Sequence, residues 1–565
     1  MTAPGLASLL LPIDAFDTSS HQVMGRRVAG SSFAQGLASS LKPGEQLTVY
    51  TGSREGLPSL QTLLQPVLQP GAQVQLQADL DPALIATNGC LHLPDPGLHH
   101  WCWLRAEGAS HRFSLTGVTH TLCSHRVMQG LEQLVTAPLE PWDALVCTSR
   151  SAKQVVQHAM ACMHQRLEQR FQQKLPLPQG PQLPLIPLGI DPTPFHWRGR
   201  FASRQEQRLQ ARQQLGLSPS ARVVLFLGRL SFHSKAHPLP LYRALEQLSA
   251  EHELVLLECG HIFNSAIAAA YDELRQRFPR LTLRRLGGLT PASEEEKKLA
   301  LAAADLFCSP ADNLQETFGL SVLEAMASSL PVVASDWNGY RDLVVHGRTG
   351  WLVPCRDLLQ NQTKPDALDR RFSLGLQDYD SSVGLRSLGV VLDHAALEKS
   401  LGDLLADPER CACMGDAGRK RIESVFAWPV VTGQYRELWS ELSQRRASAQ
   451  LRGSTTPWPL AHSALLFSNH ASDPPSTGPW LLTAQCSDPS LLTDTMQTCF
   501  LQQLIPIHSL KLLADTLQVQ RCQGEHAFET IDLEQLYQHC NIPADQWSRV
   551  TNVLEKLAIL TAARP

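Results

Sequence analysis

The chain has 565 residues, enough for several domains. Apolar residues make up 43% and charged residues 18% of it, proportions that fit a globular protein and exclude a disordered chain. The net charge of −4 excludes a general electrostatic attraction to nucleic acid, and no apolar run is long enough to cross a bilayer. The 14 cysteines are scattered without a C-x-x-C pair, so we expect reduced thiols in a cytoplasmic protein.

The first part of the chain alternates short apolar runs with helical stretches, a pattern typical of a parallel sheet with helices on both faces. The run Leu9–Ile13 predicts a first strand, and a glycine-bearing loop at Gly25–Ser32, which includes Gly30, leads into a helix that ends near Leu41. A loop that binds a ligand and a tight turn that only starts the helix are equal alternatives here. Further strands are predicted at residues 46–50, 72–76, 113–120 and 142–149.

His120 lies at the end of the predicted strand Phe113–His120. Ligands of open α/β sheets bind at the carboxyl ends of the strands, so a histidine at this place can bond to a ligand. A histidine that only stabilises the structure is the equal alternative. A long helix is then predicted at residues 151–173, where basic side chains outnumber the single acid, Glu168. A solvated helix face is the favoured interpretation, and contact with a membrane surface is the alternative.

A second parallel sheet is predicted from the apolar run Val223–Leu227. Arg229 follows this run in the sequence Gly-Arg-Leu, and Lys235 lies six residues later. A guanidinium and an ammonium at the carboxyl end of a strand can bind a diphosphate, although exposed surface positions are the alternative. The remaining strands of this sheet are predicted at residues 253–258, 281–286, 306–309, 331–335 and 350–353.

The most informative stretch begins with the strand Leu306–Ser309 and passes through a loop into a helix that begins near Phe318. Gly319 allows a close backbone approach, and the free N–H groups of a helix start attract anions. Glu316 precedes the helix and Glu324 lies inside it, and both can accept hydrogen bonds from hydroxyls. A nucleotide-sugar, with its diphosphate between two hydroxyl-bearing groups, would use all of these groups. An ordinary strand–helix–strand unit with surface glutamates is the alternative.

The run from Leu306 to Val353 resembles the signature region of glycosyltransferase family 4, in which seven residues separate two glutamates. The resemblance implies the α/β fold called GT-B, with two Rossmann-like doubly wound domains facing a cleft. Here it would be followed by a small, mainly helical C-terminal module. The predicted boundaries are 1–192 for the acceptor-side domain, 193–430 for the nucleotide-sugar domain, 431–446 for a helix that crosses back, 447–480 for a linker and 481–565 for a helical or winged-helix-like module.

The resemblance also implies the residues of the site. The expected catalytic side chains are Glu316, His120, Arg229 and Lys235. The expected donor-binding residues are Arg229, Lys235, Gly288, Glu316, Phe318, Gly319, Leu320, Glu324 and Gly30. In this scheme the two cations hold the donor phosphates, Glu324 accepts from the ribose, and Glu316 contacts the sugar.

Two D-x-D sequences, at residues 79–81 and 378–380, match the metal-binding pattern of other glycosyltransferases. A pattern this short occurs by chance roughly once or twice in a chain of this length, and neither copy lies beside the phosphate-binding elements. We therefore expect no metal ion and no cofactor. The segment 357–388 lacks periodicity and predicts an inserted loop, and helices are predicted near the C-terminus at residues 491–504, 533–540 and 545–560.

The resemblance implies a retaining glycosyltransferase, and we expect a hexosyltransferase that moves a sugar from a nucleotide-diphosphate-sugar to an unidentified acceptor. A non-catalytic nucleotide-sugar-binding scaffold protein and a GT-B sugar-phosphate synthase are the alternatives. We expect a cytoplasmic enzyme, and contact of residues 151–173 with the inner membrane surface, which some related enzymes show, stays the alternative to a solvated helix face. The C-terminal module is expected to bind a protein partner, and no nucleic acid is expected.

Overall fold

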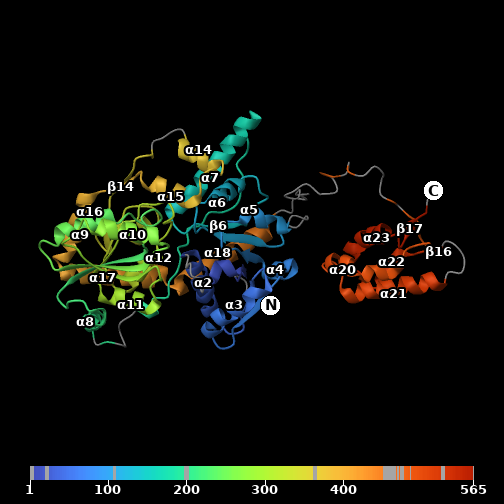
Figure 1. Cartoon of the computed structure of the whole chain (residues 1–565), viewed down its shortest axis with the longest axis horizontal. Helices are drawn as coiled ribbons and strands as arrows, with labels where there is room; N and C mark the ends of the chain where they lie inside the picture. The colour runs from blue at the N-terminus through green and yellow to red at the C-terminus, as the bar shows by residue number, and fades with distance from the viewer. Residues whose placement is uncertain are drawn as a thin grey trace. The chain divides into compact units, whose positions relative to one another are not determined.

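The computed structural model describes residues 6–18, 25–105, 110–195, 201, 203–360, 365–449, 466–467, 470, 476, 478–483, 485–523 and 529–563. The chain divides into two compact units, Met1–Pro459 and Leu460–Pro565 (Figure 1). The first unit holds two parallel sheets, each with helices packed around it, and the second holds a small antiparallel sheet with helices. Among the helices of the described residues, none has an apolar stretch that could cross a membrane.

The first sheet has six parallel strands in the order β3-β2-β1-β4-β5-β6. They are β1 (Ser8–Leu10), β2 (Gln46–Tyr50), β3 (Gln73–Gln77), β4 (Cys90–His92), β5 (Ser114–Val118) and β6 (Ala144–Val146). This is the strand order of the Rossmann fold, and it confirms the predicted doubly wound architecture. Strand β4 was not predicted, because a three-residue strand is too short to show a hydrophobic pattern.

Helices cover both faces of this sheet. They are α1 (Ile13–Phe16), α2 (Gly25–Ser39), α3 (Leu57–Leu64), α4 (Pro82–Asn88), α5 (Leu98–Trp101), α6 (His125–Gln133) and α7 (Arg150–Phe171). Since α2 already begins at Gly25, the loop predicted at residues 25–32 is wrong, and Gly30 lies within the helix. A Cβ atom at Gly30 would lie 2.2 Å from the carbonyl oxygen of Ala15, so this glycine allows α1 to pack closely on α2.

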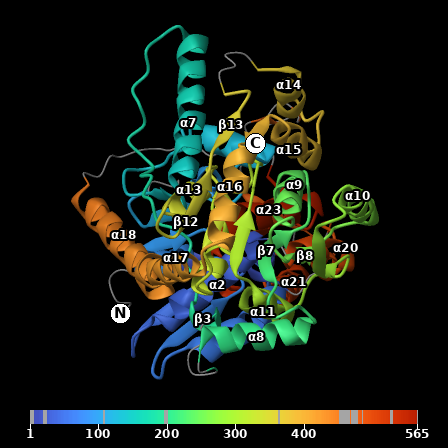
Figure 2. The ribbon, with the colours of Figure 1, turned by 90° about the vertical axis from the view of Figure 1, so that its left-hand side faces the viewer.

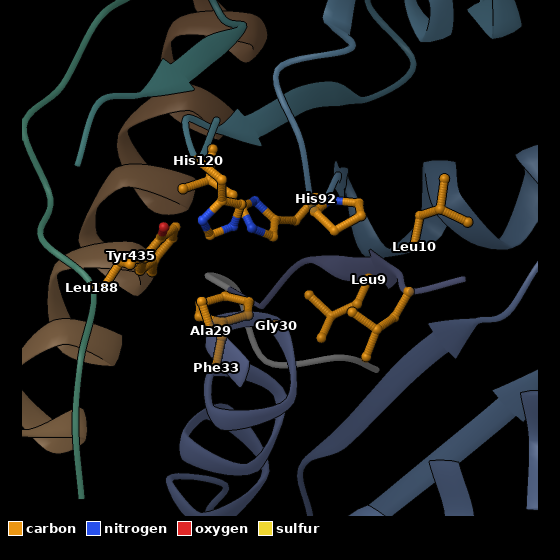
Figure 3. Close-up of a pocket in the computed structure, with 12 residues that line it drawn as sticks. Leu9, Leu10, Ala29, Gly30, Phe33, His92, His120, Leu188 and Tyr435 are labelled. Carbon is orange, nitrogen blue, oxygen red and sulfur yellow. The ribbon is translucent and has the colours of Figure 1, made fainter. Parts of the chain in front are cut away.

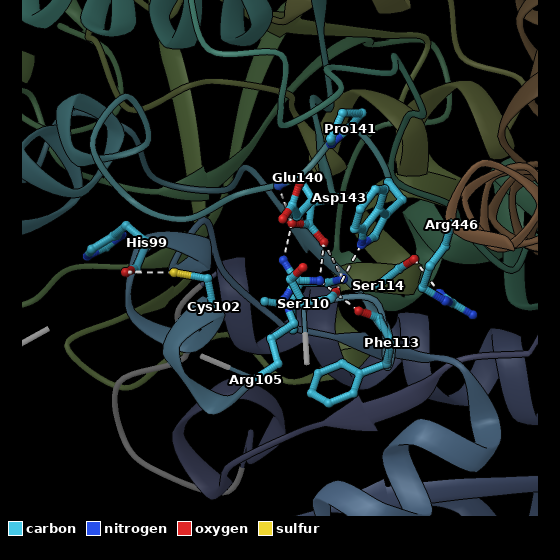
Figure 4. A network of polar contacts seen from close by, with 12 residues as sticks. His99, Cys102, Arg105, Ser110, Phe113, Ser114, Glu140, Pro141, Asp143 and Arg446 are labelled. Atoms are coloured by element: carbon cyan, nitrogen blue, oxygen red, sulfur yellow. Dashed lines mark hydrogen bonds and ion pairs between the residues drawn. The ribbon is translucent and has the colours of Figure 1, made fainter. Parts of the chain in front are cut away.

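A buried ion pair holds strand β5 in place (Figure 4). The guanidinium of Arg105 bonds to both carboxylate oxygens of Asp143 and, at 2.7 Å, to the carbonyl of Phe113. The carboxylate of Asp143 also accepts a hydrogen bond from the backbone N–H of Leu115 at 2.8 Å. Because these bonds satisfy two charges in a dry interior, they fix the strand whose carboxyl end leads to His120.

The second sheet repeats the same strand order, β9-β8-β7-β10-β11-β12. Its strands are β7 (Arg222–Arg229), β8 (Leu254–His261), β9 (Thr282–Gly288), β10 (Leu306–Ser309), β11 (Val332–Ser335) and β12 (Gly350–Val353). Its helices are α8 (Arg204–Leu215), α9 (Leu239–Leu248), α10 (Ser265–Arg275), α11 (Glu294–Ala303), α12 (Leu320–Ala327), α13 (Tyr340–Leu343), α16 (His394–Leu405) and α17 (Pro408–Arg421). Chain order reverses between β7 and β10, which places a ligand-binding crevice at their carboxyl ends.

The segment predicted to be a loop at residues 357–388 contains two helices, so that prediction is wrong. Helices α14 (Ala367–Ser373) and α15 (Tyr379–Ser387) lie between the paired strands β13 (Cys355–Asp357) and β14 (Val390–Leu392). Aspartates cap both helices, and Asp378 accepts a hydrogen bond from the backbone N–H of Ser381. Asp81 caps α4 in the same way. One carboxylate of each D-x-D sequence is therefore used in helix capping.

The helix α18 (Trp428–Ser448) returns to the first domain (Figure 2). The indole N–H of Trp428 donates a hydrogen bond to the hydroxyl of Ser32 at 2.8 Å, and the indole N–H of Trp439 donates to the hydroxyl of Thr116 at 3.2 Å. The helix begins at Trp428, three residues before the predicted start of the crossing helix at residue 431. Its contacts join the two Rossmann-like domains into one compact unit.

The second unit contains an antiparallel sheet in the order β16-β15-β17, formed by β15 (Trp480–Leu482), β16 (Glu529–Thr530) and β17 (Thr561–Ala562). Its helices are α20 (Thr495–Leu501), α21 (Ile507–Gln523), α22 (Leu533–His539) and α23 (Trp547–Lys556). Helix α21 was not predicted, although Leu510, Leu513 and Leu517 have helical spacing and are buried. Most of the predicted linker 447–480 lies outside the described residues.

Candidate active site

The expected phosphate-binding groups lie at the carboxyl ends of β7 and β10. Arg229 is the last residue of β7, and the signature loop follows β10. The guanidinium of Arg229 donates to the amide oxygen of Gln315 at 3.2 Å and to the carbonyl of Ser234 at 3.1 Å. These contacts place the arginine between the signature loop and the loop that carries Lys235, which is the crevice expected at a reversal of strand order.

Lys235 and Glu316 form an ion pair inside this crevice. The ammonium lies 2.7 Å from a carboxylate oxygen of Glu316 and 3.1 Å from the hydroxyl of Tyr340, and Lys235 is only 6% exposed. Burial acts to lower the pKa of Lys235, but the charge of Glu316 and the Tyr340 hydroxyl outweigh it and raise that pKa. The ammonium therefore stays charged, and a bound diphosphate would share it with Glu316.

The start of α12 supplies backbone donors beside these side chains. Gly319 caps the helix with a φ of 126°, a conformation that favours glycine, and a Cβ there would lie 2.4 Å from the ring of Tyr340. Phe318 is buried, with its ring 6.3 Å from that of Phe426, and Leu320 is the first residue of the helix. The first N–H groups of α12 are therefore held at the crevice, where they can bind an anion.

Glu324 lies one turn into α12 and has a partner that the sequence did not predict. The ammonium of Lys297 lies 3.0 Å from Glu324 and 2.9 Å from Glu294. Burial raises the pKa of the Glu324 carboxyl, and Lys297 opposes that rise. The one sequence signal for this pair is the placement of Lys297 three residues after Glu294 on α11, which does not reveal the contact with α12.

Glycines at the ends of β7, β8 and β9 bring the backbone of these strands close together. A Cβ at Gly260 would lie 1.7 Å from the carbonyl oxygen of Gly228, and one at Gly287 would lie 2.1 Å from that of Gly260. Gly288, by contrast, has no atom within 4 Å of a Cβ position among the described residues. The end of β9 therefore has open space at Gly288, the residue expected to lie against the base.

His120 lines an apolar cavity of the first domain (Figure 3). Its lining residues are Leu9, Leu10, Leu11, Ala29, Gly30, Phe33, His92, Pro94, Val118, His120, Leu188 and Tyr435. Burial lowers the pKa of His120 to about 4 and that of His92 to about 3, so both imidazoles are neutral at neutral pH. His92 was not predicted, because it lies on the unpredicted strand β4.

The signature loop also contacts the first domain. The hydroxyl of Thr317 donates to the carbonyl of His120 at 2.6 Å, and the hydroxyl of Ser149 donates to the carbonyl of Thr317 at 2.8 Å. Arg150, next along the chain, forms an ion pair with Asp342. The signature loop of the second domain therefore contacts the first domain at His120 and Ser149, whereas Gly30 lies on α2 and lines the apolar cavity.

The family described as Glycosyl transferases group 1 matches residues 207–362. A D-inositol 3-phosphate glycosyltransferase of Nocardioides is 34% identical over 190 residues, which cover 30% of this chain and 40% of that relative. An alpha-maltose-1-phosphate synthase of Mycolicibacterium smegmatis is 24% identical over 361 residues, which cover 61% of this chain and 79% of that relative.

Among solved structures, sucrose-phosphate synthase of Thermosynechococcus elongatus aligns with a TM-score of 0.48 at 18% identity, over 78% of this chain and 100% of that one. The chain spans 40% of the length of the inositol-phosphate enzyme, so the similarity to that relative concerns a part of it. Residues 207–362 match the model of the group 1 glycosyl transferases, which confirms the predicted resemblance of this region.

Proposed function

We propose that the protein is a retaining glycosyltransferase of family 4 that takes its sugar from a nucleotide-diphosphate-sugar. The observation that carries the proposal is the convergence of Arg229, Lys235 and the start of α12 at the crevice between β7 and β10. These groups supply positive charge where a diphosphate would bind, and Glu316 and Glu324 supply hydroxyl acceptors on both sides of it.

In the proposed reaction, the bond between the anomeric carbon and the phosphate oxygen breaks while an acceptor hydroxyl attacks the same carbon. The nucleoside diphosphate leaves with the bonding electron pair, and the proton of the hydroxyl passes to its phosphate. Arg229 and Lys235 stabilise the charge that develops on this leaving group. Because the protein's own cations serve this purpose, the proposal needs no metal ion.

Donor hydrolysis without acceptor tests this function. The full-length protein is incubated with UDP-, GDP- and ADP-sugars, and release of the nucleoside diphosphate is measured. We expect release from one donor class, and we expect Arg229→Ala to abolish most of it. If every donor stays intact while the protein still binds the nucleotide, the chain is a nucleotide-sugar-binding protein without catalysis.

The similarity to alpha-maltose-1-phosphate synthase favours one more specific candidate, a synthase whose acceptor is a sugar phosphate. The two alternatives differ in the acceptor only. Adding glucose phosphates or inositol phosphates to the hydrolysis assay distinguishes them, because a true acceptor raises the rate of nucleotide release and yields a larger phosphorylated product.

We also propose that the end of α7 contacts the inner membrane surface of the cell. Arg166 and Lys174 pair with Glu132 and Glu168, and Arg170 lies next in the chain to the 66% exposed Phe171. Helices that bind anionic bilayers carry basic and apolar side chains of this kind, and the proposal rests on this pair of residues. Co-sedimentation with anionic and with neutral vesicles tests this proposal.

For the second unit, we propose a protein partner.

A further inference from the structure

The inserted helices α14 and α15 belong to the second domain but contact the first one. The hydroxyl of Tyr379, the first residue of α15, lies 3.4 Å from the sulfur of Cys123, three residues after His120. The imidazole of His125 donates to the carbonyl of Ser373 at 3.1 Å, and its ring centre lies 5.7 Å from that of Phe372. Figure 1 shows both helices beside α6 and α7 of the first domain.

Helix α15 also packs on the loop that carries Lys235. A Cβ at Gly384 would lie 3.0 Å from the Cβ of His233, so the helix and the loop are in close contact. His233 bonds to the hydroxyl of Ser231, and the carbonyl of Ser234 accepts a hydrogen bond from Arg229. One face of α15 therefore contacts the phosphate-binding loop, while its first residue reaches the first domain.

The charge of Arg229 acts at this contact. Burial raises the pKa values of both Tyr379 and Cys123, and the charge of Arg229 opposes both shifts. The phenol and the thiol are neutral at neutral pH and can form a hydrogen bond without compensating a charge. The helix that makes this contact thus packs on the loop whose Ser234 carbonyl accepts from Arg229, the group expected to hold the donor phosphates.

We propose that Tyr379 is a positioning residue of the glycosyltransferase site. By bonding to Cys123, it holds the segment 120–123, with His120, against the phosphate-binding end of β7. This inference rests on the proposed function. The nucleotide would bind mainly to groups of the second domain, whereas transfer of the sugar also needs the first domain in place. Loss of Tyr379 should therefore lower kcat much more than nucleotide affinity.

The experiment compares Tyr379→Phe and Tyr379→Ala with a control, Leu388→Ala, which removes a 73% exposed side chain at the end of the same helix. We expect kcat to fall about threefold in Tyr379→Phe and at least about tenfold in Tyr379→Ala, with nucleoside diphosphate affinity changed by less than about twofold. Amide hydrogen exchange in residues 119–126 should become faster in Tyr379→Ala, and the control should behave as wild type.

Different results would overturn this inference and the proposed function. If the wild type turns over no nucleotide-sugar, the function is wrong, and exchange in residues 119–126 still decides whether Tyr379 joins the domains. If the wild type is active, an unchanged kcat in both tyrosine variants overturns the inference. A parallel loss of kcat and nucleotide affinity also overturns it, because it indicates general damage to the second domain. Tyr379→Phe keeps the ring, so it tests the hydrogen bond even if Tyr379→Ala does not fold.

Discussion

Replacing Lys297 by methionine should make the stability of the second domain depend strongly on pH. Lys297 lies 3.0 Å from Glu324, and their side chains are 19% and 15% exposed. At this distance the attraction is about 5.5 kcal/mol at an effective dielectric constant of about 20. Breaking a buried pair costs about 3–5 kcal/mol, because the remaining charge is left in a poor environment. We expect a loss near about 3 kcal/mol at pH 8, since Glu324 keeps the more distant Lys235.

The pH dependence follows from the carboxyl of Glu324. Burial raises its pKa in the folded state, and removal of Lys297 raises that pKa further. The folded state therefore holds this proton more tightly than the unfolded chain does. Its stability falls as the pH rises from the pKa of an unfolded glutamate, about 4.3, through the raised pKa of the folded state. As the pH falls through this raised pKa, the carboxyl of the variant takes up a proton, so we expect the loss to be smaller at pH 5 than at pH 8.

Urea unfolding of the full chain at pH 5 and pH 8 measures the free energy of unfolding of the second domain. The transition of this domain is expected to be the one that shifts to higher urea when nucleotide is added. Lys297→Arg keeps the charge and should lose less than half as much stability. Glu294→Gln removes the other partner of Lys297, which is 69% exposed, and should change stability by less than about 1 kcal/mol. An equal loss at both pH values would refute the electrostatic argument and indicate a packing effect of the lysine stem.

Three further predictions concern the site and the domains. Arg229→Ala should lower kcat/KM by an amount on the order of 3 kcal/mol, while a folded protein with near-normal turnover would contradict the phosphate assignment. Turnover should persist in EDTA, and loss of activity restored by manganese or magnesium would contradict the metal-free reaction. Arg105→Met should destabilise the first domain by about 3–5 kcal/mol in urea unfolding, since it leaves Asp143 charged and 0% exposed, whereas the Arg105→Met, Asp143→Leu double variant should be more stable than the single one.

The sequence predicted those parts of the fold that show a hydrophobic pattern. The strand Val223–Leu227 is a continuous apolar run that lies in the buried strand β7, and the spacing of Glu316 and Glu324 identified the signature region. Strand β4 and helices α14 and α15 are short, and the only buried side chains of the two helices are Val383 and Ser387, so no apolar periodicity marks them. Their aspartate caps are visible in the sequence, but a capping aspartate and a D-x-D aspartate cannot be distinguished without coordinates.

The contacts across the site could not be predicted in the same way. The pairs Lys235–Glu316, Lys297–Glu324 and Tyr379–Cys123 join residues that lie 81, 27 and 256 positions apart in the chain. Each pair depends on which strands and helices lie next to one another in the folded domain. A single sequence indicates this arrangement only through the general rules for α/β sheets.

The ion pairs of the site indicate how a donor would bind. Lys235 is already neutralised by Glu316, whereas among the described residues Arg229 bonds to an amide and a backbone carbonyl and to no carboxylate. A diphosphate should therefore be attracted first by Arg229 and by the start of α12. A phosphate would share Lys235 with Glu316, and its share would grow as Glu316 turns to other donors, such as the hydroxyls of the sugar. This exchange would link recognition of the sugar to the transfer of positive charge onto the leaving group, so Lys235 should contribute more to kcat and Arg229 more to donor binding.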